Sequence, residues 1–404
     1  MRLFGIPSSL RRYSIALTLH QSIFVYSFER IYFLARGLSI TEMIVLEVMY
    51  NALVFVLDIP TGALADRWGR KPLLVAARVF TFFEFFVIGF ATNFGMFALA
   101  IFSAALGTVC FSGTGHAFVY DTLKQDGTAD EFERVQGRLE LFSNAAVLLG
   151  GIAGAVVANF DLALPYFLTS AFMAGAALVT LTLREPTRAD SAPRADESAS
   201  PLSFLAHIRT AFGFVRAHST IRSVLLYGAL LGGVFIYADE FYQVYANAIG
   251  IPLYWLGLLS AAAVAIESVG SAGAYRVRKR FGYAASLRTV VVVGALLLFA
   301  ASQLSNLVGL GLILLMFGLH DMARTLNYGL LHSNVESFRR ATVDSAYTML
   351  VNLLSVGIGF TFAWVADTYS IFSAYLFLAA LIALYGVYYL FTRQAPGNAE
   401  TRSL

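Results

Sequence analysis

Twelve apolar stretches, each long enough to cross a lipid bilayer, are the feature that most constrains the fold of this chain. About 20 apolar residues span the hydrocarbon core as a helix, and such stretches lie at 14–35, 42–64, 73–91, 95–120, 135–158, 162–183, 221–246, 253–275, 286–304, 307–331, 342–365 and 370–392. In lipid the backbone must bond to itself, and ten-residue segments of alternating polarity, typical of membrane barrels, do not occur. We therefore predict an all-α polytopic membrane protein with twelve transmembrane helices.

The composition excludes an ordinary soluble domain. Hydrophobic residues make up 58% of the 404 residues and charged residues only 13%, whereas soluble domains carry about 25% charged residues. The single cysteine, Cys110, cannot form an intramolecular disulfide, and no Cys/His cluster has metal-ligand spacing. We expect neither a metal nor a cofactor.

The positive charges predict the topology, because short cytoplasmic loops are enriched in Lys and Arg. Basic residues precede the first stretch and follow every even-numbered one, while Arg36 lies in a loop assigned to the outside. Both termini are therefore expected in the cytoplasm of a protein of the cytoplasmic membrane, with an uncleaved first helix. The net charge of +3 is explained by this topology and does not indicate a nucleic-acid partner.

A polar linker divides the chain into two halves. Residues 184–203 are rich in Ser, Ala, Pro and mixed charge, which does not bury enough apolar surface to fold, so we predict six-helix halves at 1–183 and 204–404. Leu202–Ala217 is expected to form a surface helix, or else to extend the seventh span. A shift of 213 residues takes Gly37 to Gly250 and Gly69 to Gly282, a weak repeat typical of transporters built from two related halves.

The loop after the second span carries the most specific motif. It reads Gly62-Ala-Leu-Ala-Asp66-Arg67-Trp68-Gly69-Arg70-Lys71 and resembles the signature loop of the major facilitator superfamily, Gly-x-x-x-Asp-Arg-x-Gly-Arg-Arg/Lys, at every fixed position. The twelve spans, the linker and a degenerate copy at 275–282 extend the resemblance over nearly the whole chain. It implies a transporter whose two halves are pseudo-symmetric.

The resemblance also implies a conformational latch on the cytoplasmic side. In this superfamily the motif aspartate lies against the N-terminal end of span eleven, and an arginine of the loop pairs with an acid that closes span four. The matching latch residues here are Gly62, Asp66, Arg67, Gly69, Arg70, Lys71 and Asp121. A basic loop that serves only topology is the alternative, but it explains neither Asp66 nor the glycines.

A polar stripe lies near the middle of span ten. At 100° per residue, five polar side chains fall within about 100° of the helix circumference: His320, Asp321, Arg324, Asn327 and Tyr328. Ionisable groups inside a membrane are costly and usually belong to a pathway, so we predict a solute or proton site here. The alternative is a structural Asp321–Arg324 pair beside a histidine satisfied in the bundle.

Ionisable residues of other spans are further candidates for the solute or proton pathway: Glu29, Asp58, Asp239 and Glu267. Glu29 and Asp239 lie nearer the outer ends of their spans. Two interpretations apply to them there: a role in outer gating, or an ordinary position at the membrane interface. Asp58 is either proton-sensitive or a partner of Arg78 or Arg138. Glu267 has no basic neighbour in sequence and is a candidate proton carrier.

The pattern departs from that of the superfamily's proton-coupled drug exporters. Those proteins carry an arginine in span four and a Gly-Pro-x-x-Gly-Gly motif in span five, whereas this span four lacks an arginine and span five reads Gly150-Gly151-Ile152-Ala153-Gly154. The start of span eleven (Arg340-Ala341-Thr342) and the end of span four (Tyr120-Asp121) resemble the sequences of a bacterial branch that is loosely grouped with exporters. Drug efflux is therefore less secure than transport itself.

The sequence as a whole predicts a monomeric secondary transporter that moves a small solute across the bilayer by alternating access, coupled to protons. Efflux of an amphipathic organic compound, as a proton antiporter, suits the aromatic-rich spans; proton-coupled uptake of a polar metabolite is the alternative. The motifs Gly-x-x-x-x-Gly-Lys-Ser/Thr, His-Glu-x-x-His and Gly-x-Ser-x-Gly do not occur. ATP-driven transport and an intramembrane enzyme or sensor are therefore disfavoured.

The predicted topology is testable with site-directed probes. A reporter fused after Arg393 and probes placed at 186–201 should both report the cytoplasm, whereas a probe at Arg36 should report the outside, because the basic loops alternate. Labelling with a membrane-impermeant thiol reagent measures this. A linker that faces the outside would contradict the two-half arrangement.

Overall fold

The computed structural model describes residues 6–186, 219–333, 335 and 340–391, without the side chains of 59–67, 219–220, 340–342 and 389–391. These ranges are helical and contain no strand. The α-helices are α1 (Arg11–Gln21), α2 (Glu29–Ala35), α3 (Ile40–Trp68), α4 (Arg70–Phe90), α5 (Phe94–Phe111), α6 (Thr114–Gln125), α7 (Phe132–Val157), α8 (Leu164–Leu181), α10 (Ser219–Ala248), α11 (Leu253–Gln303), α12 (Leu307–Ser333), α13 (Arg340–Thr368) and α14 (Ile371–Phe391), with short 3₁₀ turns at Ser8–Leu10 and Ala129–Glu131.

The predicted membrane crossings are all present as helices. Within the described residues, 10 helices are long and apolar enough to cross a membrane. One of them, α11, contains both the eighth and the ninth predicted spans and bends at Gly282, and the first predicted span is divided between α1 and α2. The all-α, multi-pass prediction is confirmed.

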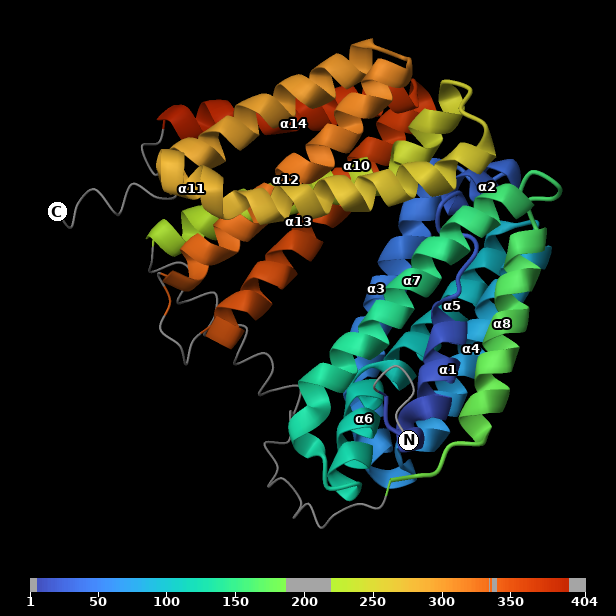
Figure 1. Ribbon diagram of the computed structural model, residues 1–404. Helices are drawn as coiled ribbons and strands as arrows, with labels where there is room; N and C mark the ends of the chain where they lie inside the picture. Colours follow the sequence, from blue (N-terminus) through green and yellow to red (C-terminus); the bar gives the residue numbers. More distant parts are fainter. Residues whose placement is uncertain (1–5, 187–218, 334, 336–339, 392–404) are drawn as a thin grey trace. The chain divides into compact units, whose positions relative to one another are not determined.

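The helices form two compact units, Met1–Ser198 with Pro252–Leu258 and Ala199–Ile251 with Leu259–Leu404. In the first unit α4 packs against α5 and α8, and α1 packs against α7 and α8 (Figure 1). In the second unit α10 packs against α12, α13 and α14. The half boundaries at 183 and 204 stay a prediction, and the surface helix predicted at Leu202–Ala217 lies outside the described residues.

The weak sequence repeat corresponds to repeated backbone geometry. Gly37 and Gly250 have φ of 88° and 81°, and Gly69 and Gly282 have φ of 95° and 73°. Positive φ is the region that favours glycine. The turn hydrogen bonds match as well, because Leu38 N–H donates to Phe33 and Ile251 N–H donates to Ala246 with the same spacing. The two halves therefore share the same turns at equivalent positions, which a merely similar helical composition would not produce.

The first span is interrupted where α7 approaches most closely. Between α1 and α2 the Phe24 N–H donates to the Thr169 hydroxyl (3.1 Å), and the Ser27 hydroxyl donates to the Gly151 carbonyl (2.9 Å). A Cβ added at Gly154 would overlap the backbone of Phe24. Non-helical backbone is tolerated at membrane depth only where protein satisfies it, and these contacts do so.

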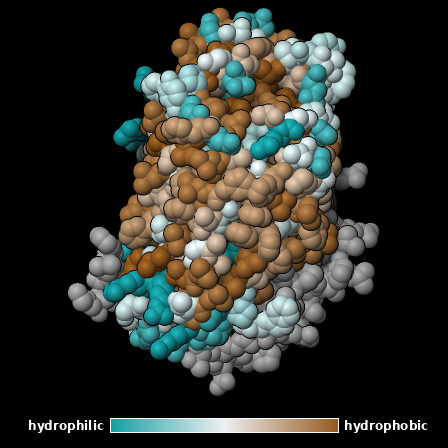
Figure 2. Space-filling model, turned by 90° about the vertical axis from the view of Figure 1, so that its right-hand side faces the viewer, coloured by the Kyte–Doolittle hydropathy of each residue, from teal (hydrophilic) through white to brown (hydrophobic). Residues whose placement is uncertain are grey.

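The outer surface of these helices is strongly apolar. Hydrophobic residues dominate the face in Figure 2, and hydrophilic side chains gather toward its two ends. Large exposed side chains include Phe55, Leu99, Leu149, Phe299 and Leu384. Soluble monomers rarely expose apolar surface of this extent, and the pattern is the one expected of helices that meet lipid.

The close approach of α7 predicts an asymmetric response to two glycine substitutions on that helix. Gly154→Ala should destabilise the protein by about 1–3 kcal/mol, because the added Cβ meets a backbone that has no room to move. Gly137→Ala is the control, since nothing lies within 4 Å of its Cβ position and alanine favours the helix. Thermal denaturation in detergent, followed by size-exclusion chromatography, measures the difference; equal melting temperatures would contradict the packing argument.

Candidate functional site

The second unit gathers ionisable residues from three helices. Asp239 lies on α10, Glu267 on α11, and His320, Asp321 and Arg324 on α12. Asp239 interacts electrostatically with Asp321, and Glu267 interacts with Asp239, Asp321 and Arg324. The structure thus joins two candidates that are distant in sequence to the span-ten stripe. We call these five residues the acidic cluster.

Asp321 is the centre of the acidic cluster. One nitrogen of Arg324, Nη2, lies 3.1 Å from each of its carboxylate oxygens, and His320 Nδ1 lies 3.7 Å from Oδ1. The side chain of Asp321 is 12% exposed and that of Arg324 is 54% exposed. The guanidinium therefore reaches Asp321 from a more open position, which makes it available to a second anion or acceptor.

Two buried polar atoms of the stripe have no hydrogen-bond partner among the described residues, Nδ1 of His320 and Oδ1 of Asn327. The His320 ring is stacked on Phe235 with centroids 3.7 Å apart and planes within 5°. On α10, Gly228 leaves room for Asn327 and Tyr347, which a Cβ would meet. Buried polar atoms are normally bonded, so these two are places where a solute can bond.

Aromatic rings surround the acidic cluster. Phe235 lies 5.3 Å from Phe317, and Tyr242 lies 5.7 Å from Phe317, both edge to face. The Tyr242 hydroxyl is bonded to Ser260 (2.6 Å), and Tyr328 is 37% exposed. Rings beside carboxylates are the chemistry that attracts organic cations.

The acidic cluster carries more negative than positive charge. Its carboxylates are Asp239, Glu267 and Asp321, and its only permanent cation is Arg324. Within the described residues neither Asp239 nor Glu267 forms a hydrogen bond or an ion pair, and no group of three or more His, Cys, Asp or Glu side chains is arranged to hold a metal ion.

The signature loop makes one of the contacts that the family resemblance implies. Arg70 Nε lies 3.5 Å from Oδ2 of Asp121, with both side chains partly exposed. Gly69 has φ 95° and precedes α4 directly. The side chains of Asp66 and Arg67, and those of 340–342 at the start of span eleven, lie outside the described residues, so the contacts of Gly62 with them are not described either.

Glu185 is a loop contact that the sequence analysis missed. Its carboxylate accepts hydrogen bonds from the backbone N–H groups of Arg70 (2.6 Å) and Lys71 (2.7 Å), the first residues of α4. Negative charge is favourable at a helix N-terminus. A Cβ at Gly69 would lie 2.8 Å from Glu185 Oε1, so this contact favours glycine at position 69 in addition to the positive φ. Glu185 was assigned to a linker by composition, and its contact with a helix start has no local sequence signal.

Two further candidates lie in the first unit. Glu29 opens α2 and interacts electrostatically with Arg30, while Asp58 is exposed on α3. Arg78, a suggested partner of Asp58, is buried with its guanidinium 4.7 Å from the Phe111 ring centroid. Its Nε and Nη1 have no hydrogen-bond partner among the described residues, so these atoms do not pair with Asp58.

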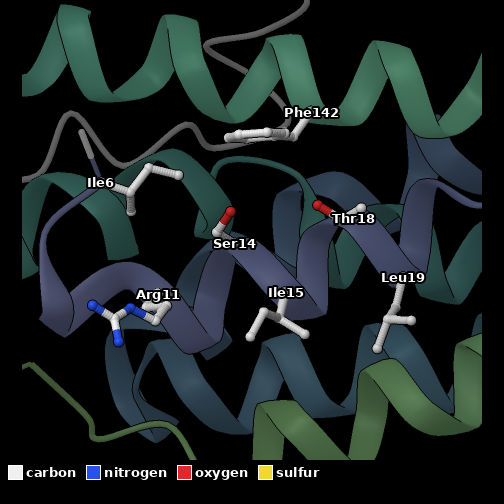
Figure 3. A pocket seen from close by; sticks show the side chains of 7 residues that line it. All are labelled: Ile6, Arg11, Ser14, Ile15, Thr18, Leu19 and Phe142. Carbon is white, nitrogen blue, oxygen red and sulfur yellow. The ribbon is translucent and has the colours of Figure 1, made fainter. Parts of the chain in front are cut away.

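The first unit also contains an open pocket of about 320 Å³ along α1, shown in Figure 3. The Ser14 and Thr18 side chains point to the side of Phe142, and Ile15 and Leu19 point to the other side. The lining is mainly apolar and consists of Ile6, Arg11, Ser14, Ile15, Thr18, Leu19 and Phe142. This pocket suits an apolar group rather than a polar one.

Comparison with known proteins settles the family. Residues 12–360 match the Major Facilitator Superfamily. The chain belongs to the major facilitator superfamily. It is a multi-pass membrane transporter of the secondary type, and the family contains transporters rather than enzymes. No protein of curated function matches the sequence significantly.

Solved structures show the same fold at low sequence identity. The nucleoside transporter NupG superposes with a TM-score of 0.74 at 14% identity, covering 94% of this chain and 98% of that one. A bacterial homolog of the human lysosomal transporter Spinster superposes with 0.66 at 14% identity (95% and 96% covered), and a D-xylose-proton symporter with 0.58 at 15% identity (95% and 98% covered). At this identity the likeness concerns the fold alone.

The Glu185 contact predicts that removing the carboxylate weakens the start of α4. Glu185→Ala should lower the stability of this transporter by about 0.5–2 kcal/mol, the usual cost of losing a helix cap. Asp130→Ala, at another exposed acidic position of the first unit, is the matched control and should leave the melting temperature unchanged. Identical melting temperatures for both variants would show that Glu185 does not cap the helix.

Proposed function

We propose that this transporter exports an amphipathic organic cation in exchange for protons. The observation that carries the proposal is the excess of carboxylates in the acidic cluster, where Glu267 and Asp321 interact with Arg324 and Asp239 interacts with the like charge of Asp321. A carboxylate inside a membrane is costly when it is uncompensated. A proton or an organic cation relieves the same charge, so the two compete for one site.

The surroundings of the acidic cluster support a cation with apolar bulk. The ring of Phe235 is stacked on His320 and lies edge to face with Phe317, and aromatic faces attract cations. A strongly anionic solute fits this charge distribution poorly.

Competition for the acidic cluster leads directly to exchange. When the site faces the cytoplasm, an organic cation displaces a proton from Asp239 or Glu267; when it faces outside, protons displace the cation. Neither carboxylate forms a hydrogen bond or an ion pair among the described residues, and Arg324, which interacts with Glu267, is itself paired with Asp321. Arg324 pairs with Asp321 at 3.1 Å, so in this proposal Asp239 and Glu267 rather than Asp321 exchange the proton.

The contacts of the signature loop support a role as a latch of the cytoplasmic side. Arg70 pairs with Asp121 and Glu185 binds the start of α4, and in our proposal Asp66 completes the latch against span eleven, with Gly62, Arg67, Gly69 and Lys71 shaping the loop. We further propose a monomer in the cytoplasmic membrane, with both termini inside.

Proton-coupled uptake of a polar metabolite is the second candidate. The unbonded atoms His320 Nδ1 and Asn327 Oδ1 favour it, because a donor and an acceptor with no partner suit a solute rich in hydroxyl or amide groups. Solved relatives in fold include a nucleoside transporter and a xylose-proton symporter.

Transport by the purified protein in liposomes distinguishes the two candidates. Tetraphenylphosphonium and ethidium are the cationic probes, and uridine and xylose are the polar ones. An exporter of the proposed type accumulates the cations when the proton gradient is directed outward from the vesicle. Accumulation of uridine or xylose under an inward proton gradient, without cation exchange, would favour uptake instead.

The stripe predicts a specific effect of removing both charges of its ion pair. Arg324→Ala alone leaves the largely buried carboxylate of Asp321 without its partner, so loss of protein would be ambiguous. The double variant Asp321→Asn with Arg324→Gln should fold, because no lone charge remains, and should lose transport at least about tenfold. Arg280→Gln, at an exposed arginine of the same unit, is the control. Normal transport by the double variant would make the pair structural.

A further inference from the structure

An unbonded tyrosine hydroxyl in the first unit points to a second ionisable site. Tyr32, Tyr227, Tyr245 and Tyr375 are fully buried, and each donates its hydroxyl proton to backbone carbonyls. Tyr166 on α8 is equally buried, at 0% exposure, yet its hydroxyl has no partner among the described residues. A buried hydroxyl without a partner is costly, so this one requires an acceptor that is present in another state of the site.

Carboxylates are the candidate acceptors for this hydroxyl. The Tyr166 ring packs against Phe28 and Phe85 with centroids 6.5 Å away in both cases, and these two rings are the sequence neighbours of Glu29 and Glu84. Tyr166 itself interacts electrostatically with Glu29 and Glu84. The phenol therefore interacts with acids that come from α2 and α4.

A third carboxylate belongs to the same group. Glu47 on α3 interacts electrostatically with Glu29, and its Oε2 is buried without a hydrogen-bond partner among the described residues. Within the described residues, none of Glu29, Glu47 and Glu84 forms an ion pair within 4.0 Å. We call these three residues with Tyr166 the α2–α4 carboxyl site.

The charges around the α2–α4 carboxyl site do not balance. Arg30 interacts with Glu29 and Glu47, whereas Glu84 interacts with the like charge of Glu29. The other titratable or charged groups that face the site or its tyrosines are Tyr26, Tyr32, Arg36, Tyr50 and Asp161. Uncompensated negative charge at low dielectric is strongly unfavourable, so the site must hold a cation.

The cation is a proton rather than a metal ion. Among the described residues no three His, Cys, Asp or Glu side chains are arranged to ligate a metal. We propose that Glu29 and Glu84 bind one exchangeable proton, and that the Tyr166 hydroxyl donates to the carboxylate when that proton leaves. Tyr166 is thus a positioning residue that stabilises the ionised form.

The exchange is a simple acid–base step. The carboxylic O–H bond of Glu29 or Glu84 breaks, the proton passes to water, and the electron pair stays on the carboxylate oxygen. The Tyr166 O–H bond then turns to that oxygen without breaking. The step involves residues of the first unit alone, so it goes beyond the acidic cluster and its solute chemistry.

Infrared spectroscopy of the full-length protein in lipid tests the α2–α4 carboxyl site without any solute. The probe is the C=O band of protonated carboxylic acids, followed through a pH titration. Glu29→Gln and Glu84→Gln should each remove or reshape a titrating component of this band. Tyr166→Phe should shift the midpoint of that component upward by about one pH unit, because a hydrogen bond to a charged group is lost.

Tyr32→Phe is the matched control. Its ring lies 4.3 Å from that of Tyr166, but its hydroxyl is bonded to the carbonyls of Ile88 and Gly89, so the titration midpoint should not move. Size-exclusion chromatography verifies that each variant is folded. Two conservative carboxyl variants are used, so that if one of them does not fold the other still tests the titrating component.

The outcomes separate this proposal from the proposed function. A titrating band that is the same in wild type, Glu29→Gln and Glu84→Gln overturns the α2–α4 carboxyl site, as does a Tyr166→Phe midpoint equal to wild type. If the titrating C=O component is lost only in the double variant Asp239→Asn with Glu267→Gln, the proton is bound at the acidic cluster. That result also overturns the α2–α4 carboxyl site, but it supports the proton binding of the proposed function. If cation exchange fails but the first-unit component behaves as described, the proposed function falls and this site stands.

Discussion

Hydrogen bonding of the backbone in a solvent without water is the constraint on which this structure depends. Lipid offers no partner for an open N–H or carbonyl group, so the crossings are helices, and every interruption needs protein around it. The gap between α1 and α2 shows the consequence. Phe24 and Ser27 bond to α8 and α7, and glycine at position 154 lets the α7 backbone lie against the gap.

The same constraint makes each polar side chain within the helices informative. Four fully buried tyrosine hydroxyls donate to backbone carbonyls, whereas the Tyr166 hydroxyl has no partner among the described residues and interacts electrostatically with two carboxylates. In the second unit Asp321 pairs with Arg324, whereas Asp239 and Glu267 form no hydrogen bond or ion pair among the described residues and interact with each other and with Asp321. Charge that a bilayer protein leaves unbalanced marks the places where ligands or protons restore the balance.

Contacts between distant residues were only partly predictable. The signature loop predicted the Arg70–Asp121 pair through family resemblance, and the pair is present at 3.5 Å. Glu185 was not predicted, because a carboxylate that binds the start of another helix has no periodicity or spacing of its own. Glu47 and Tyr166 were missed for the same reason: each lies in an apolar span, and its neighbours come from other helices.

The sequence by itself determined the class, the number of crossings, the family and the repeat. These follow from local composition, from a ten-residue motif and from glycines whose positive φ recurs at Gly37, Gly250, Gly69 and Gly282, all of which are properties of short segments. Only the tertiary structure decided which ionisable groups share a site, because helix packing sets the distances between side chains far apart in sequence. It joined Asp239 and Glu267 to His320, Asp321 and Arg324, and Glu29 to Glu84, since electrostatic energy depends on separation in space.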